Sequence, residues 1–187
     1  GITSGKWGYQ YYAWELKPDT SMVIELMPGY VDHFKFQYPW TAQSTISNGV
    51  WGKAEPIGAY ILEDQINPEY DYANDLGSEC MITGNGSSSP LGSDVDRGYT
   101  RLISPSMDLS KYNKPILNFQ AWTVKRNLTN GSNAQGGHRV YLISATDTLL
   151  IDILVANLPN WENYTFLLDM SPLKNKSNVH IMFEAVE

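Results

Sequence analysis

The side chains best able to do chemistry are nine carboxylates between Ala54 and Asp96, a stretch of 43 residues without Lys or Arg. They are Glu55, Glu63, Asp64, Glu69, Asp71, Asp75, Glu79, Asp94 and Asp96. Carboxylates gathered where no basic side chain competes are typical of a calcium site, because calcium takes six to eight oxygen ligands. The same pattern also fits an acidic loop that faces water. Both interpretations stay open on this count alone.

The negative charge of the chain is concentrated in this acidic stretch. The net charge is -7, from 13 basic and 20 acidic residues, and the acidic stretch alone carries -9. The remaining 144 residues therefore total 13 minus 11, or +2. A pI near 4.9 argues against nucleic acid as a partner, since phosphate binding needs a basic surface.

Catalytic patterns are weak in this sequence. The three histidines, His33, His138 and His180, lie far apart, whereas a zinc site needs three or four nitrogen or sulfur ligands. Cys80 precedes Met81 and Ile82 in an apolar run, which favours a buried, inert thiol over a nucleophile. No nucleophile elbow, phosphate loop or dinucleotide fingerprint occurs. We expect a protein that is not an enzyme, while paired carboxylates leave a hydrolase as the lesser alternative.

Length and composition indicate one domain, or one domain with a piece of another. The chain has 187 residues, of which 42% are hydrophobic, enough for a core. A single cysteine excludes an internal disulfide. No apolar run approaches the roughly 20 residues that span a bilayer, and no signal peptide opens the chain. The sequence therefore predicts a mature or excised soluble piece without membrane insertion.

The elements that would position these side chains read as strands. Strand signals come regularly in six segments, and several of these alternate with the period of a half-buried strand. The segments are Tyr99–Ile103, Ile116–Thr123, His138–Ser144, Leu149–Ala156, Trp161–Leu168 and Asn178–Val186. Upstream, Met22–Met27 and the alternating Tyr30–Phe36 look like two more strands, and Leu149–Val155 is apolar enough for a central strand or a helix. Residues 41–98 are rich in loop-forming residues, with one short apolar run at Cys80–Thr83. Many short strands joined by Asn-Gly turns predict an all-β antiparallel sandwich.

An ordered series of motifs then gives a family resemblance. The segments are Gly49–Pro56, Pro68–Tyr72, Gly77–Asn85, Asp94–Ser110, Leu117–Trp122, Trp161–Thr165 and Val179–Val186. In this order they resemble the MAM-like jelly-roll domain of secreted bacterial multi-domain proteins, often attached to zinc carboxypeptidases. Residues 1–29 are similar to the end of a carboxypeptidase regulatory-like, transthyretin-type module, which predicts the tail of a preceding module or a linker there. The resemblance implies a jelly roll over 30–187 that lacks its last strand, because the family continues beyond the strand ending at Glu187.

The resemblance also implies a structural cation, usually calcium. Asp94 and Asp96 match the Asp-x-Asp motif of the family, Asp71 lies in the matching Pro-x-Tyr-Asp segment, and Asp75 and Glu55 are further candidates. Such an ion would neutralise part of the local charge and fix two long loops. The alternative is that Asp94 and Asp96 only cap turns through backbone N–H groups.

The function implied is that of an accessory or adhesion module, secreted or at the cell surface. Its partners would be other domains of the parent protein, extracellular proteins or glycans. A carbohydrate-binding module is the alternative, because exposed aromatic rings stack on sugars. The candidate rings are Trp40, Trp51, Trp122, Trp161, Tyr60, Tyr70 and Tyr72. We expect Trp51, Trp122 and Trp161 to lie in the core instead.

Overall fold

The computed structural model describes residues 2–3, 9–10, 29–61, 63–86, 92–124, 137–154 and 159–186. These residues form antiparallel β-sheets arranged as a β-sandwich-like molecule, so the all-β prediction is confirmed. No helix in this part of the chain is long and apolar enough to cross a membrane.

The larger layer is a five-stranded antiparallel sheet in the order β11-β10-β13-β8-β3. Its strands are β11 (Thr148–Leu154), β10 (Gly137–Ile143), β13 (His180–Val186), β8 (Tyr99–Ile103) and β3 (Thr41–Ser44). On β10, Val140 and Leu142 are almost fully buried. Arg139 and Tyr141, which alternate with them, point to the opposite face. One face of the sheet therefore packs against the hydrophobic core.

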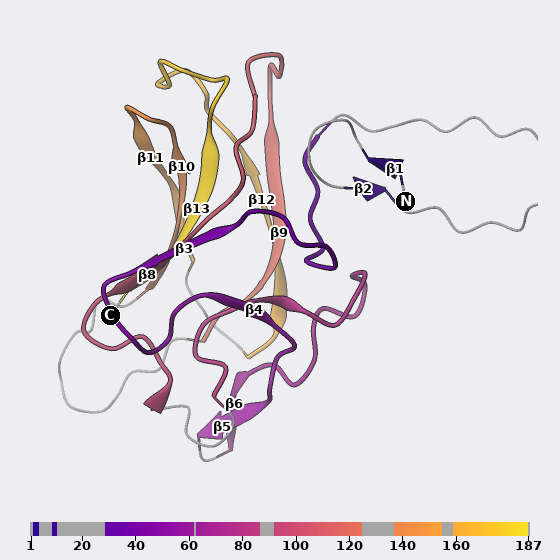
Figure 1. Cartoon of the computed structure of the whole chain (residues 1–187), viewed down its shortest axis with the longest axis vertical. Coiled ribbons are helices and arrows are strands. Elements are labelled where there is room, and N and C mark those ends of the chain that lie inside the picture. The colour runs from indigo at the N-terminus through magenta and orange to yellow at the C-terminus, as the bar shows by residue number, and fades with distance from the viewer. Residues whose placement is uncertain are drawn as a thin grey trace, which may run out of the picture.

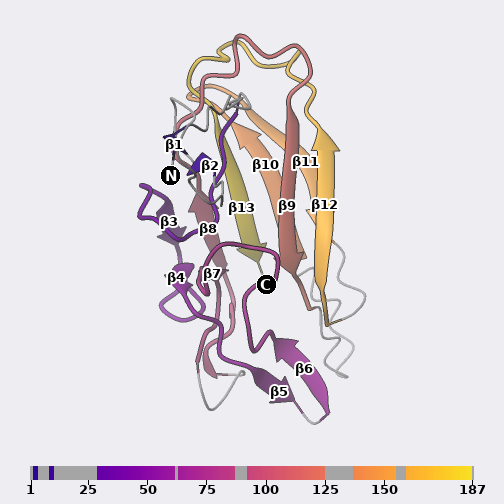
Figure 2. The ribbon, with the colours of Figure 1, turned by 90° about the vertical axis from the view of Figure 1, so that its right-hand side faces the viewer.

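The second layer consists, among the described residues, of β9 (Ile116–Trp122) paired with β12 (Trp161–Leu167). Figure 1 shows this pair opposite the larger sheet, and Figure 2 looks onto it. Phe119 of β9 joins the layers: its ring centroid lies 5.0 Å from that of Phe183 on β13 and 5.4 Å from that of Tyr164 on β12. The core therefore lies between the two layers.

Short sheets occupy the chain between β3 and β8. β4 (Gly52–Ala54) pairs with β7 (Cys80–Ile82), and β5 (Ala59–Ile61) pairs with β6 (Asp64–Asn67). Near the N-terminus, β1 (Ile2–Thr3) pairs with β2 (Tyr9–Gln10). The loop-rich character predicted for residues 41–98 is thus interrupted by five short strands.

Most of the predicted strands are confirmed. The six from Tyr99 onward appear as β8 to β13 with bounds that differ by no more than two residues. The predicted strand at Tyr30–Phe36 is wrong, because the Asp32 carboxylate accepts the backbone N–H of Phe34 at 2.7 Å and Phe34 takes a φ of 55°, which reverses the chain. The segment predicted at Leu149–Val155 as a central strand or a helix is the strand β11, which stands at the edge of the sheet among the described residues. Met22–Met27 lies outside the described residues.

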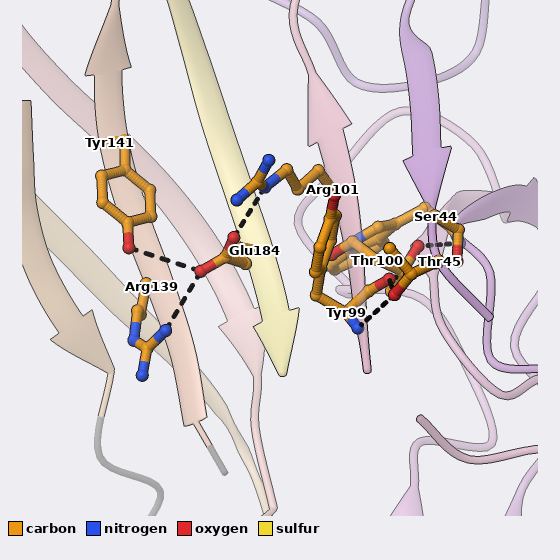
Figure 3. A network of polar contacts seen from close by, with 9 residues as sticks. Ser44, Thr45, Tyr99, Thr100, Arg101, Arg139, Tyr141 and Glu184 are labelled. Carbon is orange, nitrogen blue, oxygen red and sulfur yellow. Dashed lines mark hydrogen bonds and ion pairs between the residues drawn. The ribbon is translucent and has the colours of Figure 1, made fainter. Parts of the chain in front are cut away.

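A buried carboxylate organises the outer face of the five-stranded sheet (Figure 3). Glu184 on β13 is 4% exposed, and its two oxygens receive Arg101 Nε at 2.6 Å, Arg139 Nη1 at 3.2 Å and the Tyr141 hydroxyl at 3.3 Å. Burial alone would raise the pKa of Glu184, but the hydrogen bonds and charges of both arginines outweigh it and hold that pKa below its usual value. These contacts connect β8, β13 and β10.

Candidate functional site

Four of the five predicted ligands lie on two loops, residues 68–79 between β6 and β7, and residues 92–98 before β8, and Glu55 directly follows β4. Glycines let a neighbouring backbone approach the second loop. A Cβ on Gly49 would lie 2.6 Å from the carbonyl oxygen of Asp94, and one on Gly84 would lie 2.8 Å from that of Ser93. Both glycines have positive φ, of 66° and 64°. Close backbone packing therefore positions the Asp94 loop.

Asp71 and Asp75 form the more enclosed acidic pair. Asp71 Oδ1 accepts the backbone N–H of Tyr72 at 2.7 Å, whereas its Oδ2 is buried and receives no hydrogen bond from the described residues. Burial, and then the charge of Asp75, raise the pKa of Asp71. Asp75 contacts His33 Nδ1, and a histidine cation there would offset part of this negative charge. One carboxylate oxygen is left buried and unsatisfied.

The acidic pair or its loop affects two other side chains, Cys80 and Lys53. Cys80 at the start of β7 is 7% exposed, and burial together with Asp71 and Asp75 raises the pKa of its thiol to about 12. A nucleophilic cysteine needs a lowered pKa, so this thiol is not an activated one. Lys53 on β4 bonds Glu79 Oε2 at 3.0 Å and the Phe34 carbonyl at 2.8 Å. It thereby ties the acidic loop to the Asp32–Phe34 turn.

Asp94, Asp96 and Glu55 lie apart from the enclosed pair. The pKa of Asp94 is raised by burial and by the neighbouring charge of Asp96. Glu55 is exposed, and its backbone carbonyl, not its carboxylate, is held by Asn85 Nδ2 at 2.9 Å. The five predicted ligands are thus found as two pairs, with Glu55 separate from them.

These residues supply oxygen donors but no complete ligand set. In the part of the chain that the structure describes, no group of three or more His, Cys, Asp or Glu is arranged to hold a metal ion. Calcium also takes backbone carbonyls and water as ligands, so an acidic pair can serve as its anionic part. The calcium assignment stays a prediction, and the unsatisfied Asp71 oxygen is the atom that best fits it.

His33, which contacts the enclosed pair, and Asp32 beside it in the chain were missed from the sequence. Asp32 accepts the indole N–H of Trp40 at 2.7 Å as well as the Phe34 N–H, and burial raises its pKa despite these bonds. His33, next to it, contacts Asp75 across a long stretch of chain. Both stand in a segment whose alternation predicts a strand, and the Asp-x-Phe turn that brings them to the site has no strong sequence signal.

The tryptophans predicted to lie in the core are half-buried at its margin instead. Each indole N–H donates to a backbone carbonyl: Trp51 to Thr100 at 3.3 Å, Trp122 to Ile66 at 3.2 Å and Trp161 to Tyr70 at 3.2 Å. A buried indole needs such an acceptor, and here loops and strand ends supply it. Tyr60 and Tyr70, by contrast, are 53% and 68% exposed.

Comparison of the chain with protein-family models, with curated protein sequences and with solved structures finds no match. The resemblance to MAM-like domains therefore rests on the motif series alone.

Proposed function

We propose that this chain is a non-catalytic accessory or adhesion module of a secreted or cell-surface multi-domain protein, with a MAM-like jelly-roll fold stabilised by a bound calcium ion. The observation that carries the cation is Asp71 Oδ2, which is buried beside a second carboxylate without a hydrogen-bond donor among the described residues. Leaving such a group unsatisfied is costly. A divalent cation would satisfy it and offset the repulsion from Asp75.

The protonation state of Cys80, the possible nucleophile, supports a binding role over a catalytic one. With its thiol pKa raised to about 12, Cys80 stays protonated at neutral pH. The contact of His33 with Asp75 brings a basic side chain to the acidic pair. The residues nearest the acidic pair therefore serve packing and charge balance.

The test is thermal unfolding of the chain and of Asp71→Asn, each with calcium and with chelator. Wild type should melt several degrees higher with calcium, because a ligand that binds only the native state stabilises it. Asp71→Asn should respond little to calcium. In chelator it should melt about 2–4 °C above wild type, since about 1 kcal/mol of unsatisfied burial and repulsion is removed.

Glu69→Asn is the matched control, an acid-to-amide change at an exposed position of the same loop. It should keep the full calcium response. Equal melting temperatures of wild type with calcium and with chelator would contradict the cation site, and a chain that hydrolyses a peptide or glycan by itself would contradict the accessory role.

A further inference from the structure

The outer face of the β9–β12 layer carries a row of uncharged side chains. Leu117, Phe119 and Ala121 of β9 pack against the core, so the residues between them point outward. The antiparallel register pairs each outward residue with one on β12. From one end to the other the pairs are Ile116–Leu167, Asn118–Thr165, Gln120–Asn163 and Trp122–Trp161.

The two middle pairs form a hydrogen-bonded ladder. Asn118 Nδ2 donates to Thr165 Oγ1 at 2.9 Å, Gln120 Nε2 donates to Asn163 Oδ1 at 2.9 Å, and Asn163 Nδ2 donates to Thr165 Oγ1 at 3.2 Å. Each amide thus uses one of its two N–H groups within the ladder, and the carbonyl oxygens of Asn118 and Gln120 accept no hydrogen bond from the described residues. The ladder fixes the side chains while leaving donors and acceptors for a ligand. Prior ordering of this kind lowers the entropy cost of binding.

Aromatic rings close one end of the ladder. The ring centroids of Trp122 and Trp161 lie 6.2 Å apart, and that of Tyr72 lies 6.3 Å from Trp161. Tyr70, whose carbonyl accepts the Trp161 indole N–H, is 68% exposed. A cluster of aromatic rings packed edge to face, with interplanar angles of 75° and 62°, therefore adjoins a row of uncharged hydrogen-bonding groups.

We propose that this face binds a neutral carbohydrate chain. None of its eight outward residues is charged, although the protein carries a net charge of -7. Sugar hydroxyls both donate and accept, as the free amide N–H and carbonyl groups do, and the C–H face of a sugar ring suits Tyr and Trp. Seven residues of strand extend about 20 Å, long enough for several sugar units. The inference rests on the accessory role proposed above and names its ligand, and it does not depend on the cation.

The experiment is affinity gel electrophoresis of the whole chain in soluble β-glucan, xylan, mannan and starch, with calcium present throughout and pectin as the acidic comparison. Wild type should be retarded by at least one neutral polysaccharide. Gln120→Glu, which places a charge in the ladder, should weaken that binding about tenfold or more. Gln43→Glu on exposed β3 of the other layer makes the same change in charge and should alter binding less than about twofold.

Two further variants test the binding face in case the Gln120→Glu protein does not fold. Asn118→Ala and Tyr70→Ala change exposed positions and should each weaken binding severalfold with the far-UV circular dichroism unchanged. Retardation by none of the neutral gels, preference for pectin, or equal binding by wild type and the three face variants would overturn the proposal while leaving the accessory role standing. Cleavage of the bound polysaccharide would overturn the accessory role instead, because intact recovery is expected.

Discussion

The Cys80 thiol shows how the acidic loops act on a single residue. Cys80 is 7% exposed at the start of β7, and burial, then Asp71 and Asp75, raise its pKa to about 12. Burial and negative charge both disfavour a thiolate. The sequence favours a buried thiol at this position, and the structure confirms that Cys80 is buried.

A thiol held in this way predicts a clear reactivity pattern. Native protein at pH 8 should react with a disulfide reagent at least 100-fold more slowly than the same chain in denaturant, where the pKa returns to about 8.5. Release of the coloured thiolate, followed by absorbance, measures both rates. Fast reaction of the native protein would mean that Cys80 is accessible and ionised, and the interpretation as a structural thiol would fail.

At the scale of elements, the packing between Gly49 and the Asp94 loop decides how that loop is held. Ala at position 49 would need a φ near 66° and would place a Cβ 2.6 Å from the Asp94 carbonyl oxygen. Both effects are unfavourable, so Gly49→Ala should lower the free energy of unfolding by about 2 kcal/mol or more. Gly52→Ala is the matched control, because a Cβ there meets nothing within 4 Å, and it should change stability by less than about 0.5 kcal/mol. Urea unfolding measures both.

The contact between the two layers should depend on one aromatic side chain. The Phe119 ring packs against Tyr164, Phe166 and Phe183, with centroids 5.4, 6.1 and 5.0 Å away. Phe119→Ala should therefore cost about 3–4 kcal/mol in urea unfolding. Ile116→Ala on the same strand removes a side chain that is 65% exposed and should cost little. Similar losses for both variants would mean that β9 does not pack as described.

The strands that the sequence predicts well are those with a regular pattern. In β9 and β13 apolar residues alternate because one face of each strand lies on the core, and this periodicity can be read directly. Tyr30–Phe36 alternates as well, yet it turns at Phe34, because the bond to the Asp32 carboxylate is local and leaves the hydrophobic pattern unchanged. The pairing of His33 with Asp75 depends on tertiary packing and has no counterpart in sequence spacing.

At the scale of the whole molecule, the shifted pKa values of buried ionisable groups determine how stability depends on pH. Burial is the main cause that raises the pKa values of Asp32, Asp71 and Asp94 above 3.8. For these groups the folded state binds protons more tightly than the unfolded state, so stability falls as pH rises from about 3.8 through their folded pKa values. Glu184 acts in the opposite sense: its lowered pKa adds stability above about 4.5 that is lost as pH falls through the folded value. His138, whose pKa burial lowers, also contributes stability that is lost as pH falls below about 6.5, so without a cation this histidine and the three buried aspartates act in opposite directions across mildly acid pH.

Calcium should change this profile, because it competes with protons for the same carboxylates. The difference in melting temperature between calcium and chelator should be small near pH 4 and should grow up to pH 7, as Asp71, whose pKa is raised, ionises. Calorimetry in a series of buffers measures this difference. Asp71→Asn should reduce its dependence on pH, because the variant lacks one of the two carboxylates proposed to bind the ion. A difference that does not vary with pH would show that calcium acts elsewhere, because any site built on these carboxylates must exchange protons for the metal.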